Sequence, residues 1–399
     1  MGIFSKKKRI YLDYAASTPL DSVVLKKMMP YWALHFGNGG GLHEEGRRAK
    51  EAIDEARGKI ARTLLVQSDE IIFTGSGTEA NNLGITGYLE GLKLPFAAMH
   101  AVTSSAEHPS VLECFKDFEK RGGEVTYIDL NEQGFVEAKR VYEALMPQTR
   151  LVSVGFVNSE IGTLQPIADI AHEILRYEKK SKKGHIAFHT DACQAPLYFD
   201  CSPKRLGVDS MSIDAQKIYG PKGVGFLYSK RGINIAPILK GGGQERGIRP
   251  GTENVPLIVG MGESFLRAVE GREKESARLT QLRDYFIKKI QKEIPRAILN
   301  GDATLRSPSN VNISIPGADN EYVVIALDEQ GIAATTKSAC LGSRLRAASY
   351  VITSLTKDLN RAQSALRFTL GKHTTKKDLE QTVYALVKTV QIIDKFKFK

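Results

Sequence analysis

The sequence predicts an α/β protein with a mostly parallel central sheet, helices on both faces of that sheet, and a smaller C-terminal α/β lobe. Two observations support this prediction. From about residue 43 onward, short apolar segments alternate with helical patterns, and nearly continuous apolar character is typical of strands buried on both faces. The rhythm then changes after RPGTENVP, where a long charged helix pattern begins. A chain of 399 residues is long enough for two such lobes.

The individual elements can be assigned in chain order. Residues 43–65 give the clearest helix pattern, because six apolar residues share one helical face: Ala49, Ala52, Ile53, Ala56, Ile60 and Leu64. The expected strands of the main sheet are EIIF, HAVTSS, EVTYI, RLVSVGF, HIAFHT, VDSMSI and VGFLYS. The smaller lobe is expected to contain a helix over roughly 256–293, the strands VNISI and ALRFTL, and a helix after each strand. We expect a large domain over 14–258 and a small domain over 1–13 and 259–399.

Composition and charge exclude some classes of protein. The formal net charge is +11, but the basic residues are scattered, so contact with nucleic acid or an acidic partner is permitted rather than required. No apolar run is long enough to cross a bilayer, and no signal-peptide pattern follows the basic N-terminus. The four cysteines are widely spaced and form no CxxC pair, which is typical of free thiols in a reducing cytosol. We therefore expect a cytoplasmic protein without membrane contact, direct DNA binding or a metal site.

The segment TGSGTEANN, at 74–82, is a glycine-containing turn between an expected strand and a helix. In a mostly parallel sheet, ligands bind beyond the carboxyl ends of the strands, which is where this turn lies. Backbone N–H groups at the start of a helix bind anions, and Thr74, Ser76 and Thr78 add hydroxyl donors. The turn is thus a candidate phosphate site, although Ser and Thr also cap helices in many proteins.

Four other strand ends carry polar side chains. His108 and Asn158 follow two of the expected strands, where a helix cap and an Asx turn are the simplest explanations. Asp191 ends an apolar strand, and a buried carboxylate there needs a partner. Lys217 lies in SIDAQKIYGPKGVG, at the joint between two expected strands, where a lysine alone would be read as a surface side chain.

Considered together, these groups would suit one ligand, a planar phosphorylated pyridine aldehyde. The phosphate would bind in the turn 74–82, and the ring would lie against the planar side chain of His108. The pyridine nitrogen would pair with Asp191. The aldehyde would form a Schiff base with Lys217, which explains why an amine stands at that joint.

The chain resembles the cysteine desulfurases of the NifS/IscS-like group, which are fold-type-I, pyridoxal-phosphate (PLP) enzymes related to class V aminotransferases. The resemblance covers nearly the whole chain through the motifs YLDYAASTP, FGNGGGLHEEG, IIFTGSGTEANNL, EHPSVL, VNSEIGTLQPI, HTDACQA, QKIYGPKGVG, GGGQERGIRPGTENV, TTKSAC and ALRFTLG. It implies a transferase that removes sulfur from L-cysteine, giving L-alanine and a protein persulfide. It also implies a homodimer that passes sulfur to an acceptor protein, either an iron–sulfur scaffold or a tRNA-thiolation enzyme.

The resemblance further implies which residues bind PLP: Gly77, Thr78, His108, Asn158, Asp191, Gln194, Gln216, Lys217 and Thr252. Lys217 would hold the cofactor covalently, while His108 would stack on its ring and take part in proton transfer. Asp191 would pair with the ring nitrogen and Gln194 with the ring hydroxyl. Gly77 and Thr78 would bind the phosphate, together with Thr252 of the partner subunit.

Substrate binding and sulfur transfer are assigned by the same resemblance. Asn158 and Arg367 would hold the substrate, with Arg367 binding its carboxylate in two-pronged geometry. Asn38 and His43 lie in the matching N-terminal active-site segment and are further candidates for substrate binding.

Cys340 would be the catalytic thiol, because a thiolate can attack the substrate sulfur. It lies in a stretch of about 335–350 in the small domain, which contains Arg344 and Arg346 and resembles a mobile arm that carries sulfur to the acceptor. The remaining cysteines, Cys114, Cys193 and Cys201, are expected to be small buried apolar residues.

The chain departs from the family pattern at several positions. Gln216 stands where a histidine usually donates to the phosphate, and glutamine can still donate. Asp214 stands where a phosphate-binding serine is usual; a carboxylate would repel the phosphate, so we expect Asp214 to turn away or to pair with a cation. The segment 39–41 is all glycine, and Lys337 replaces a glycine before Cys340.

Two other functions remain open on the sequence. One is a related PLP-dependent lyase or aminotransferase, including a selenocysteine lyase, which could act without Cys340. The other is a non-catalytic sulfur-relay scaffold or RNA-binding relative, which would have no reason to keep Lys217, Asp191, His108 and Cys340 together.

Overall fold

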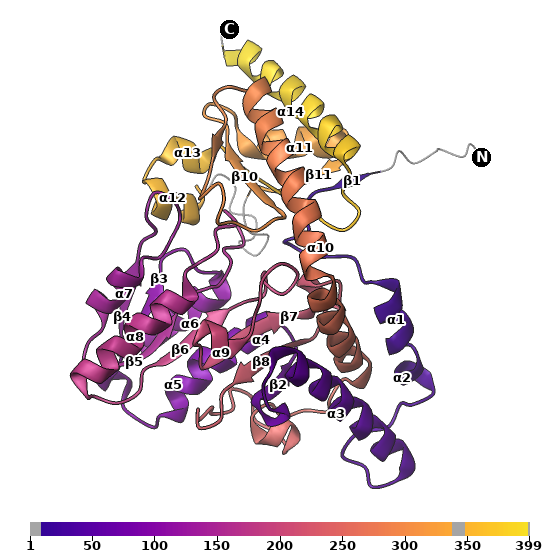
Figure 1. The fold of residues 1–399 in the computed structure, drawn as a ribbon, viewed down its shortest axis with the longest axis vertical. Coiled ribbons are helices and arrows are strands. Elements are labelled where there is room, and N and C mark those ends of the chain that lie inside the picture. The colour runs from indigo at the N-terminus through magenta and orange to yellow at the C-terminus, as the bar shows by residue number, and fades with distance from the viewer. Residues whose placement is uncertain (1–8, 337–347, 398–399) are drawn as a thin grey trace.

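The computed structural model describes residues 9–336 and 348–397 and has the expected α/β architecture, with a larger and a smaller lobe (Figure 1). The larger lobe is built on a seven-stranded sheet, in which β8 runs in the direction opposite to the six other described strands. In spatial order, the strands are β2 (Ile71–Thr74), β8 (Gly225–Ser229), β7 (Ser210–Asp214), β6 (Ala187–Asp191), β5 (Thr149–Ser153), β3 (His100–Ser104) and β4 (Glu124–Ile128). All seven strands were predicted from the sequence, with ends that differ by at most three residues.

Helices cover both faces of this sheet, and alternate strand residues point into two separate cores. On β2, Ile71 and Phe73 join one core whereas Ile72 joins the other, as the two-residue period of a strand requires. The first core lies beneath α3 (Glu44–Leu64), α7 (Ala138–Ala144), α8 (Ile167–Ser181) and the start of α10 (Val255–Glu293). The second lies beneath α4 (Gly77–Asn82), α5 (Tyr88–Gly91) and α6 (Pro109–Lys120), and shorter helices at the edges are α1 (Ser22–Met28), α2 (Pro30–Ala33) and α9 (Pro203–Leu206).

The predicted helix over 43–65 is confirmed as α3. It begins at Glu44 because the His43 side chain accepts a hydrogen bond from the Gly46 N–H, and it ends where Leu65 adopts a left-handed conformation. The six apolar residues of its predicted face are all buried. This face packs against α10, so the helix period in the sequence correctly predicted which side of α3 is covered.

The smaller lobe contains an antiparallel sheet in the order β12 (Ala365–Thr369), β10 (Asn310–Ser314), β9 (Ile298–Leu299). The predicted strands VNISI and ALRFTL are β10 and β12, followed by α11 (Asn320–Glu329) and α14 (Lys376–Lys397) as expected. Four features of this lobe were not predicted: strand β9, a parallel pair formed by β1 (Ile10–Tyr11) and β11 (Ile332–Ala333), and the short helices α12 (Tyr350–Thr356) and α13 (Leu359–Gln363).

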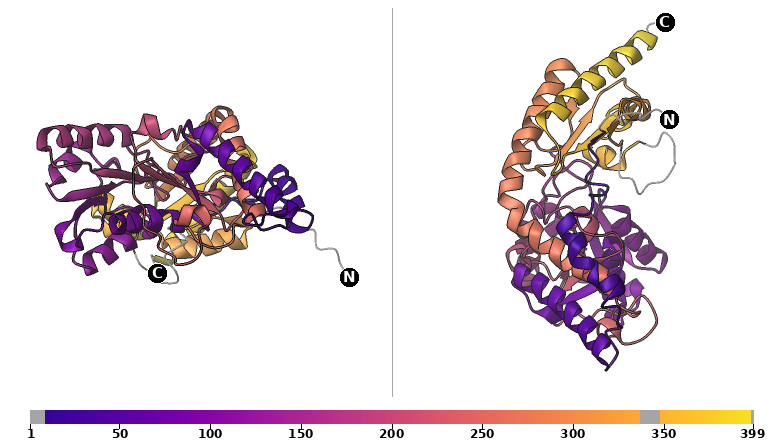
Figure 2. Two further views of the ribbon diagram at one scale, coloured as in Figure 1. Left: turned by 90° about the horizontal axis from the view of Figure 1, so that it is seen from below. Right: turned by 90° about the vertical axis from the view of Figure 1, so that its right-hand side faces the viewer.

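Helix α10 connects the two lobes along one side of the molecule, which is clearest in the right-hand view of Figure 2. Its first half, including Phe265, is buried in the core of the larger lobe. Its second half, including Phe286, is buried with Leu12 and Phe368 in the core of the smaller lobe. Among the described residues, no helix has both the length and the apolarity that a membrane crossing demands.

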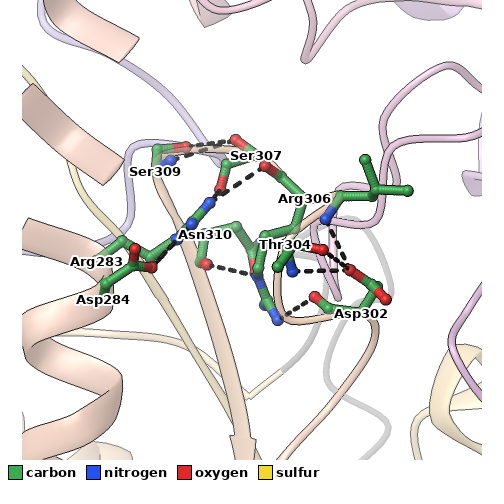
Figure 3. Close-up of polar contacts among 9 residues, drawn as sticks. Arg283, Asp284, Asp302, Thr304, Arg306, Ser307, Ser309 and Asn310 are labelled. Carbon is green, nitrogen blue, oxygen red and sulfur yellow. Dashed lines mark hydrogen bonds and ion pairs between the residues drawn. The ribbon is translucent and has the colours of Figure 1, made fainter. Parts of the chain in front are cut away.

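A buried arginine fixes the chain just before β10 and ties it to the larger lobe (Figure 3). The guanidinium of Arg306 donates to the carbonyl oxygens of Asn300, Asp302 and Asn310 at 3.0–3.3 Å. It also donates to Ile161 O, at 2.9 Å, which belongs to the loop after β5. These bonds satisfy carbonyl groups that would otherwise be buried without partners, and they hold the loop after β5 against the smaller lobe.

Candidate active site

A pocket opens at the carboxyl ends of the parallel strands, where the larger lobe meets β12 of the smaller one. It brings together most of the predicted site residues: Gly77, Thr78, His108, Asn158, Asp191, Gln194, Gln216, Lys217 and Arg367. They come from the start of α4, from the ends of β3, β5, β6 and β7 or the segments that follow them, and from β12, and most thus lie at strand ends, as expected for a mostly parallel sheet.

Lys217 ends the short helical turn Ala215–Lys217 that follows β7. Its Nζ donates to the backbone carbonyls of Ala15, at 2.9 Å, and Ala16, at 2.7 Å. Both acceptors are uncharged backbone carbonyls, so among the described residues the Lys217 amine forms no ion pair. Thr18 fastens the same N-terminal segment to the turn, since its hydroxyl donates to Gln216 O at 2.8 Å. The lysine therefore lies in a fixed backbone setting with its nitrogen at the pocket.

Asp191 and His108 are joined by a chain of side-chain hydrogen bonds. Asn81, on α4, donates to Asp191 Oδ2 at 2.7 Å and to Ser110 Oγ at 2.8 Å. Ser110 Oγ in turn lies 2.7 Å from His108 Nδ1. The other Asp191 oxygen accepts from the Cys193 N–H at 2.9 Å. This network fixes the positions of the carboxylate and the imidazole relative to each other.

His108 is both a helix cap and a pocket residue. Its Nδ1 accepts from the Ser110 N–H at 3.2 Å, and Pro109 begins α6. The two readings that the sequence left open are thus compatible, because capping through Nδ1 orients the ring at the pocket. Asn158 combines two such roles as well: its Oδ1 accepts from the Glu160 and Ile161 N–H groups, as in an Asx turn, and the residue also lines the pocket.

Sequence reasoning did not identify Glu107, Asn81 or Ser110 as site residues. Glu107 is a buried carboxyl that lines the pocket, and it accepts from Ser104 Oγ at 2.6 Å and from the Gly155 N–H at 2.9 Å. Burial, together with the nearby Asp191 carboxylate, raises the pKa of Glu107 to about 7. In the sequence, the one signal for these three residues was that each is a polar residue among apolar residues that were expected to be buried.

The raised pKa of Glu107 leads to a prediction about stability. The folded protein keeps this proton up to about pH 7, whereas an unfolded glutamate loses it near pH 4.5, so the folded state binds more protons in that interval. The free energy of unfolding should therefore fall by on the order of 3 kcal/mol, through this group, as the pH rises from about 4.5 to about 7. Glu107→Gln should lack this decline, as measured by urea unfolding at a series of pH values.

The control for this prediction is Glu132→Gln, because Glu132 is exposed. It should leave the pH dependence of the wild type unchanged. The amide in Glu107→Gln also loses one acceptor, a roughly constant cost of about 1 kcal/mol that does not vary with pH. Parallel curves for wild type and Glu107→Gln would contradict the prediction.

Asp214 corrects one expectation from the sequence. It does not turn away from the candidate phosphate site: its Oδ2 accepts from the Gly77 N–H at 3.1 Å and from Gln216 Nε2 at 3.1 Å. Its Oδ1 accepts from the Gln216 N–H at 3.1 Å. Asp214 is the last residue of β7, so its side chain lies where that strand runs against the start of α4. The Asp214 carboxylate thus accepts a hydrogen bond from the Gly77 N–H group, which was expected to bind phosphate.

Arg367 is buried on β12, between the two lobes. Its Nη2 pairs with Asp13 Oδ1 at 2.9 Å, and its Nη1 donates to Ser159 O at 2.9 Å. Among the described residues, its Nε has no hydrogen-bond partner. A buried guanidinium with one unused donor at a pocket is suited to binding a carboxylate.

Other predicted site residues are not at this pocket within one chain. Asn38, His43 and Thr252 are exposed, and the side chains of the first two hydrogen-bond locally, to Gly40 N and Gly46 N. Cys340, together with Lys337, Arg344 and Arg346, lies outside the described residues.

The three described cysteines are buried or partly buried thiols, as the sequence suggested. Burial raises the pKa of Cys114 to about 11 and also raises the pKa of Cys201. Burial, Asp191 and Asp214 raise the pKa of Cys193 well above its usual range. A thiol of raised pKa is a poor nucleophile, so none of these three is suited to attack a substrate sulfur.

Comparisons with known proteins identify the family to which the chain belongs. The family model for class-V aminotransferases matches residues 10–382. Cysteine desulfurase IscS of Dictyoglomus turgidum is 42% identical over 385 residues, which cover 96% of this chain and 95% of the relative. Cysteine desulfurase IscS 1 of Archaeoglobus fulgidus is 38% identical over 94% of this chain and 95% of its own length.

The chain is also similar to solved structures over nearly its whole length. A NifS-like protein superposes with a TM-score of 0.88 at 29% identity, covering 96% of this chain and all of the other. A structure described as SspA in complex with cysteine has a TM-score of 0.79 at 33% identity, covering 92% of this chain and all of the other.

Proposed function

Because this chain belongs to the class-V aminotransferase family, and is similar over nearly its whole length to cysteine desulfurases, we propose that it is a PLP-dependent cysteine desulfurase. It removes sulfur from L-cysteine, gives L-alanine, and holds the sulfur as a persulfide on Cys340. The observation that carries this proposal is the position of Lys217 in one pocket with Asp191, His108 and Arg367.

The pocket residues fit PLP. Among the described residues, the amine of Lys217 hydrogen-bonds to backbone carbonyls and forms no ion pair. A glycine is needed at position 77, at the start of α4, because a Cβ there would lie 2.7 Å from Cys193 Sγ and 3.0 Å from Asp214 Cβ. When bound, PLP withdraws electrons from the carbons of the amino acid substrate and so opens its sulfur to attack by a thiolate.

In this proposal, each pocket residue has a defined task. Lys217 holds the cofactor covalently and afterwards provides an amine that can accept a proton. His108 lies on the cofactor ring, in the orientation that its Nδ1 contact with Ser110 imposes. Asp191 pairs with the ring nitrogen, and the Asn81 hydrogen bond keeps that carboxylate in place. Gln194 hydrogen-bonds the ring hydroxyl.

The phosphate and the substrate are held by the remaining candidates. Gly77, Thr78 and Gln216 bind the phosphate, joined by Thr252 of the partner subunit. Arg367 binds the substrate carboxylate, which would satisfy its unused Nε donor, and Asn158 contacts both cofactor and substrate. Asn38 and His43 remain candidates for substrate binding.

The ends of the stretch that contains Cys340 support its role. Thr335 exchanges two backbone hydrogen bonds with Arg367, at 2.7 and 3.2 Å, so the chain enters this stretch beside the pocket. At the other end, the Ser349 hydroxyl donates to Glu160, and the Tyr350 hydroxyl donates to Glu107 O at 2.7 Å. The described ends of this stretch therefore both lie beside the pocket that Arg367 and Glu107 line.

We also propose a homodimer. Large apolar side chains are exposed in one stretch of the chain: Met29, Trp32, Leu34, Phe36 and Leu42. Contiguous exposed apolar surface is typical of a protein interface. The same stretch contains Asn38, which with His43 and Thr252 would complete the partner's pocket. Light scattering that reports a stable particle of one 43.9 kDa chain would contradict the dimer.

The division of the chain into a domain of 14–258 and a domain of 1–13 with 259–399 is likewise proposed. It is supported by the separate core that Ile10 and Leu12 share with the end of α10. A comparison of free and cysteine-bound structures in which these two units do not move as rigid bodies would argue against it.

We propose that the enzyme acts in the cytoplasm and passes its sulfur to an acceptor protein. The acceptor would be an iron–sulfur scaffold or a tRNA-thiolation enzyme. Fractionation of native cells tests the location, and capture of proteins that accept labelled sulfur from the persulfide tests the acceptor. Recovery of the enzyme with membranes, or failure of any protein to accept the label, would contradict these proposals.

The activity is tested by incubating the purified chain with PLP, L-cysteine and a thiol reductant. We expect alanine and sulfide in equal amounts, and, without the reductant, a persulfide on the peptide that contains Cys340. Pyruvate and ammonia, or a product that appears only with an added keto acid, would instead identify a lyase or an aminotransferase.

A further inference from the structure

Asp214 raises a question about charge at the phosphate site. Its carboxylate accepts three hydrogen bonds, and all of them come from N–H donors, of Gly77 and Gln216. Gly77 and Gln216 are also residues proposed above to bind the phosphate of PLP. The cofactor phosphate therefore needs donors that a negatively charged side chain already uses.

A phosphate that shares these donors with the Asp214 carboxylate would lie close to it. Keeping both groups ionised there would cost a large electrostatic free energy. The second pKa of a phosphate monoester is about 6, so the group is mostly a dianion above about pH 7. When two anions share one site, the pair binds one proton that neither group would bind alone. The cost is greater here because Asp214 is buried, with 5% of its surface exposed.

The side chain of Asp214 has little room to move aside. The backbone of α4 packs against it, since a Cβ added to Gly77 would lie 3.0 Å from Asp214 Cβ and 3.2 Å from Oδ2. On the other side, β8 pairs with β7 at this position through Gly225. Because α4 and β8 pack on either side of Asp214, its carboxyl group remains at the turn.

We propose that Asp214 makes cofactor binding depend on a proton: the phosphate of PLP binds in the turn together with one proton, which joins the Asp214 carboxyl group and the phosphate in an O–H···O hydrogen bond. One proton is taken from solvent for each cofactor bound, and no covalent bond changes in this step. This proton supplies an O–H group where a serine would supply its hydroxyl. This inference rests on the PLP site proposed above.

Other ionisable groups face Asp214 and belong in the same balance. Lys217 lies three residues along the same turn, and Asp191 and Cys193 approach from the end of β6. His108 and Glu107 face the pocket from the segment before α6. On α4, Glu79 is already paired with Arg249, at 2.7 Å. Of the acids at this pocket, Asp214 is the one that contacts the donors of the phosphate turn.

The test uses the full chain freed of PLP and, as probe, pyridoxine 5′-phosphate, which has no aldehyde and so cannot bond to Lys217. Calorimetry between about pH 7 and about pH 8.5, in buffers of different ionisation enthalpy, counts the protons taken up, in a range where the phosphate of the free probe is already a dianion. We expect an uptake of about one proton and a dissociation constant that rises about tenfold per pH unit.

Asp214→Asn and Asp214→Ser remove the ionisable group. Both variants should bind the probe with no proton uptake and no such pH dependence, and at about pH 8 at least about tenfold more tightly than the wild type. Asp69→Asn, which removes an exposed carboxylate paired with Arg231, should behave as the wild type. Pyridoxine, which lacks the phosphate, should bind wild type and Asp214→Asn with the same pH dependence.

Two results would overturn the inference. One is a wild type that binds the probe without taking up a proton, which needs no variant to measure. The other is a proton uptake that persists in Asp214→Asn. Failure of the proposed function is distinguishable, because it would appear as absence of sulfide release from cysteine at saturating PLP, whatever the binding data show.

Discussion

Lys217→Ala is expected to lower the rate of alanine formation from L-cysteine by about 10³-fold or more. The variant loses both the amine that holds the cofactor and the amine that moves protons in the same pocket. In the structure no other lysine among the described residues lines that pocket, so no neighbouring amine can substitute for it. Rates are measured as alanine formed under saturating PLP.

A second readout separates a lost attachment from a misfolded variant. Borohydride treatment of the wild type with PLP should fix the cofactor on the peptide that contains Lys217, and Lys217→Ala should yield no labelled peptide. Lys222→Ala is the matched control, since Lys222 lies in the same turn but is exposed. Retention of cofactor labelling and activity in Lys217→Ala would refute the proposed site.

Cys340→Ala should abolish the release of sulfide from L-cysteine while leaving the binding of PLP unchanged. The reason is chemical: the thiolate is the group that accepts the sulfur, and the described cysteines cannot replace it, because burial raises the pKa of each. We expect a loss of at least about 10³-fold in sulfide formation, as for removal of other nucleophiles. The visible absorbance of bound PLP should persist.

Cys201→Ala is the control for this variant, because Cys201 is buried away from the pocket. It should keep its activity, provided that the protein folds. The substrate profile of Cys340→Ala also distinguishes related functions. A variant that no longer cleaves cysteine but still cleaves selenocysteine would identify a selenocysteine lyase, and full activity with cysteine would contradict a role for Cys340.

The sequence predicted much of the fold because burial imposes a period on the chain. The helix period of α3 indicated which face is covered, and nearly continuous apolar runs indicated each strand of the main sheet. The short helices α12 and α13 were missed because so few residues give no reliable period. The pair β1 and β11 was missed because its strands lie far apart in the chain.

The sequence by itself also determined much of the proposed site. Lys217, Asp191 and His108 could be found because they follow expected strands, and the carboxyl ends of parallel strands meet at one edge of a sheet. That rule depends on the order of elements along the chain, so no three-dimensional information was needed to place these residues near one pocket.

The tertiary structure alone decided what each of these side chains contacts. Asp214 was expected to avoid the phosphate turn, yet it accepts a hydrogen bond from Gly77, which lies 137 residues away along the chain. Asn81 likewise joins Asp191 to Ser110 across three different elements. Such contacts depend on how α4 packs against the ends of β6 and β7. No local pattern in the sequence encodes how α4 packs. That packing depends on all the residues that are buried together in the two cores, on opposite faces of the sheet.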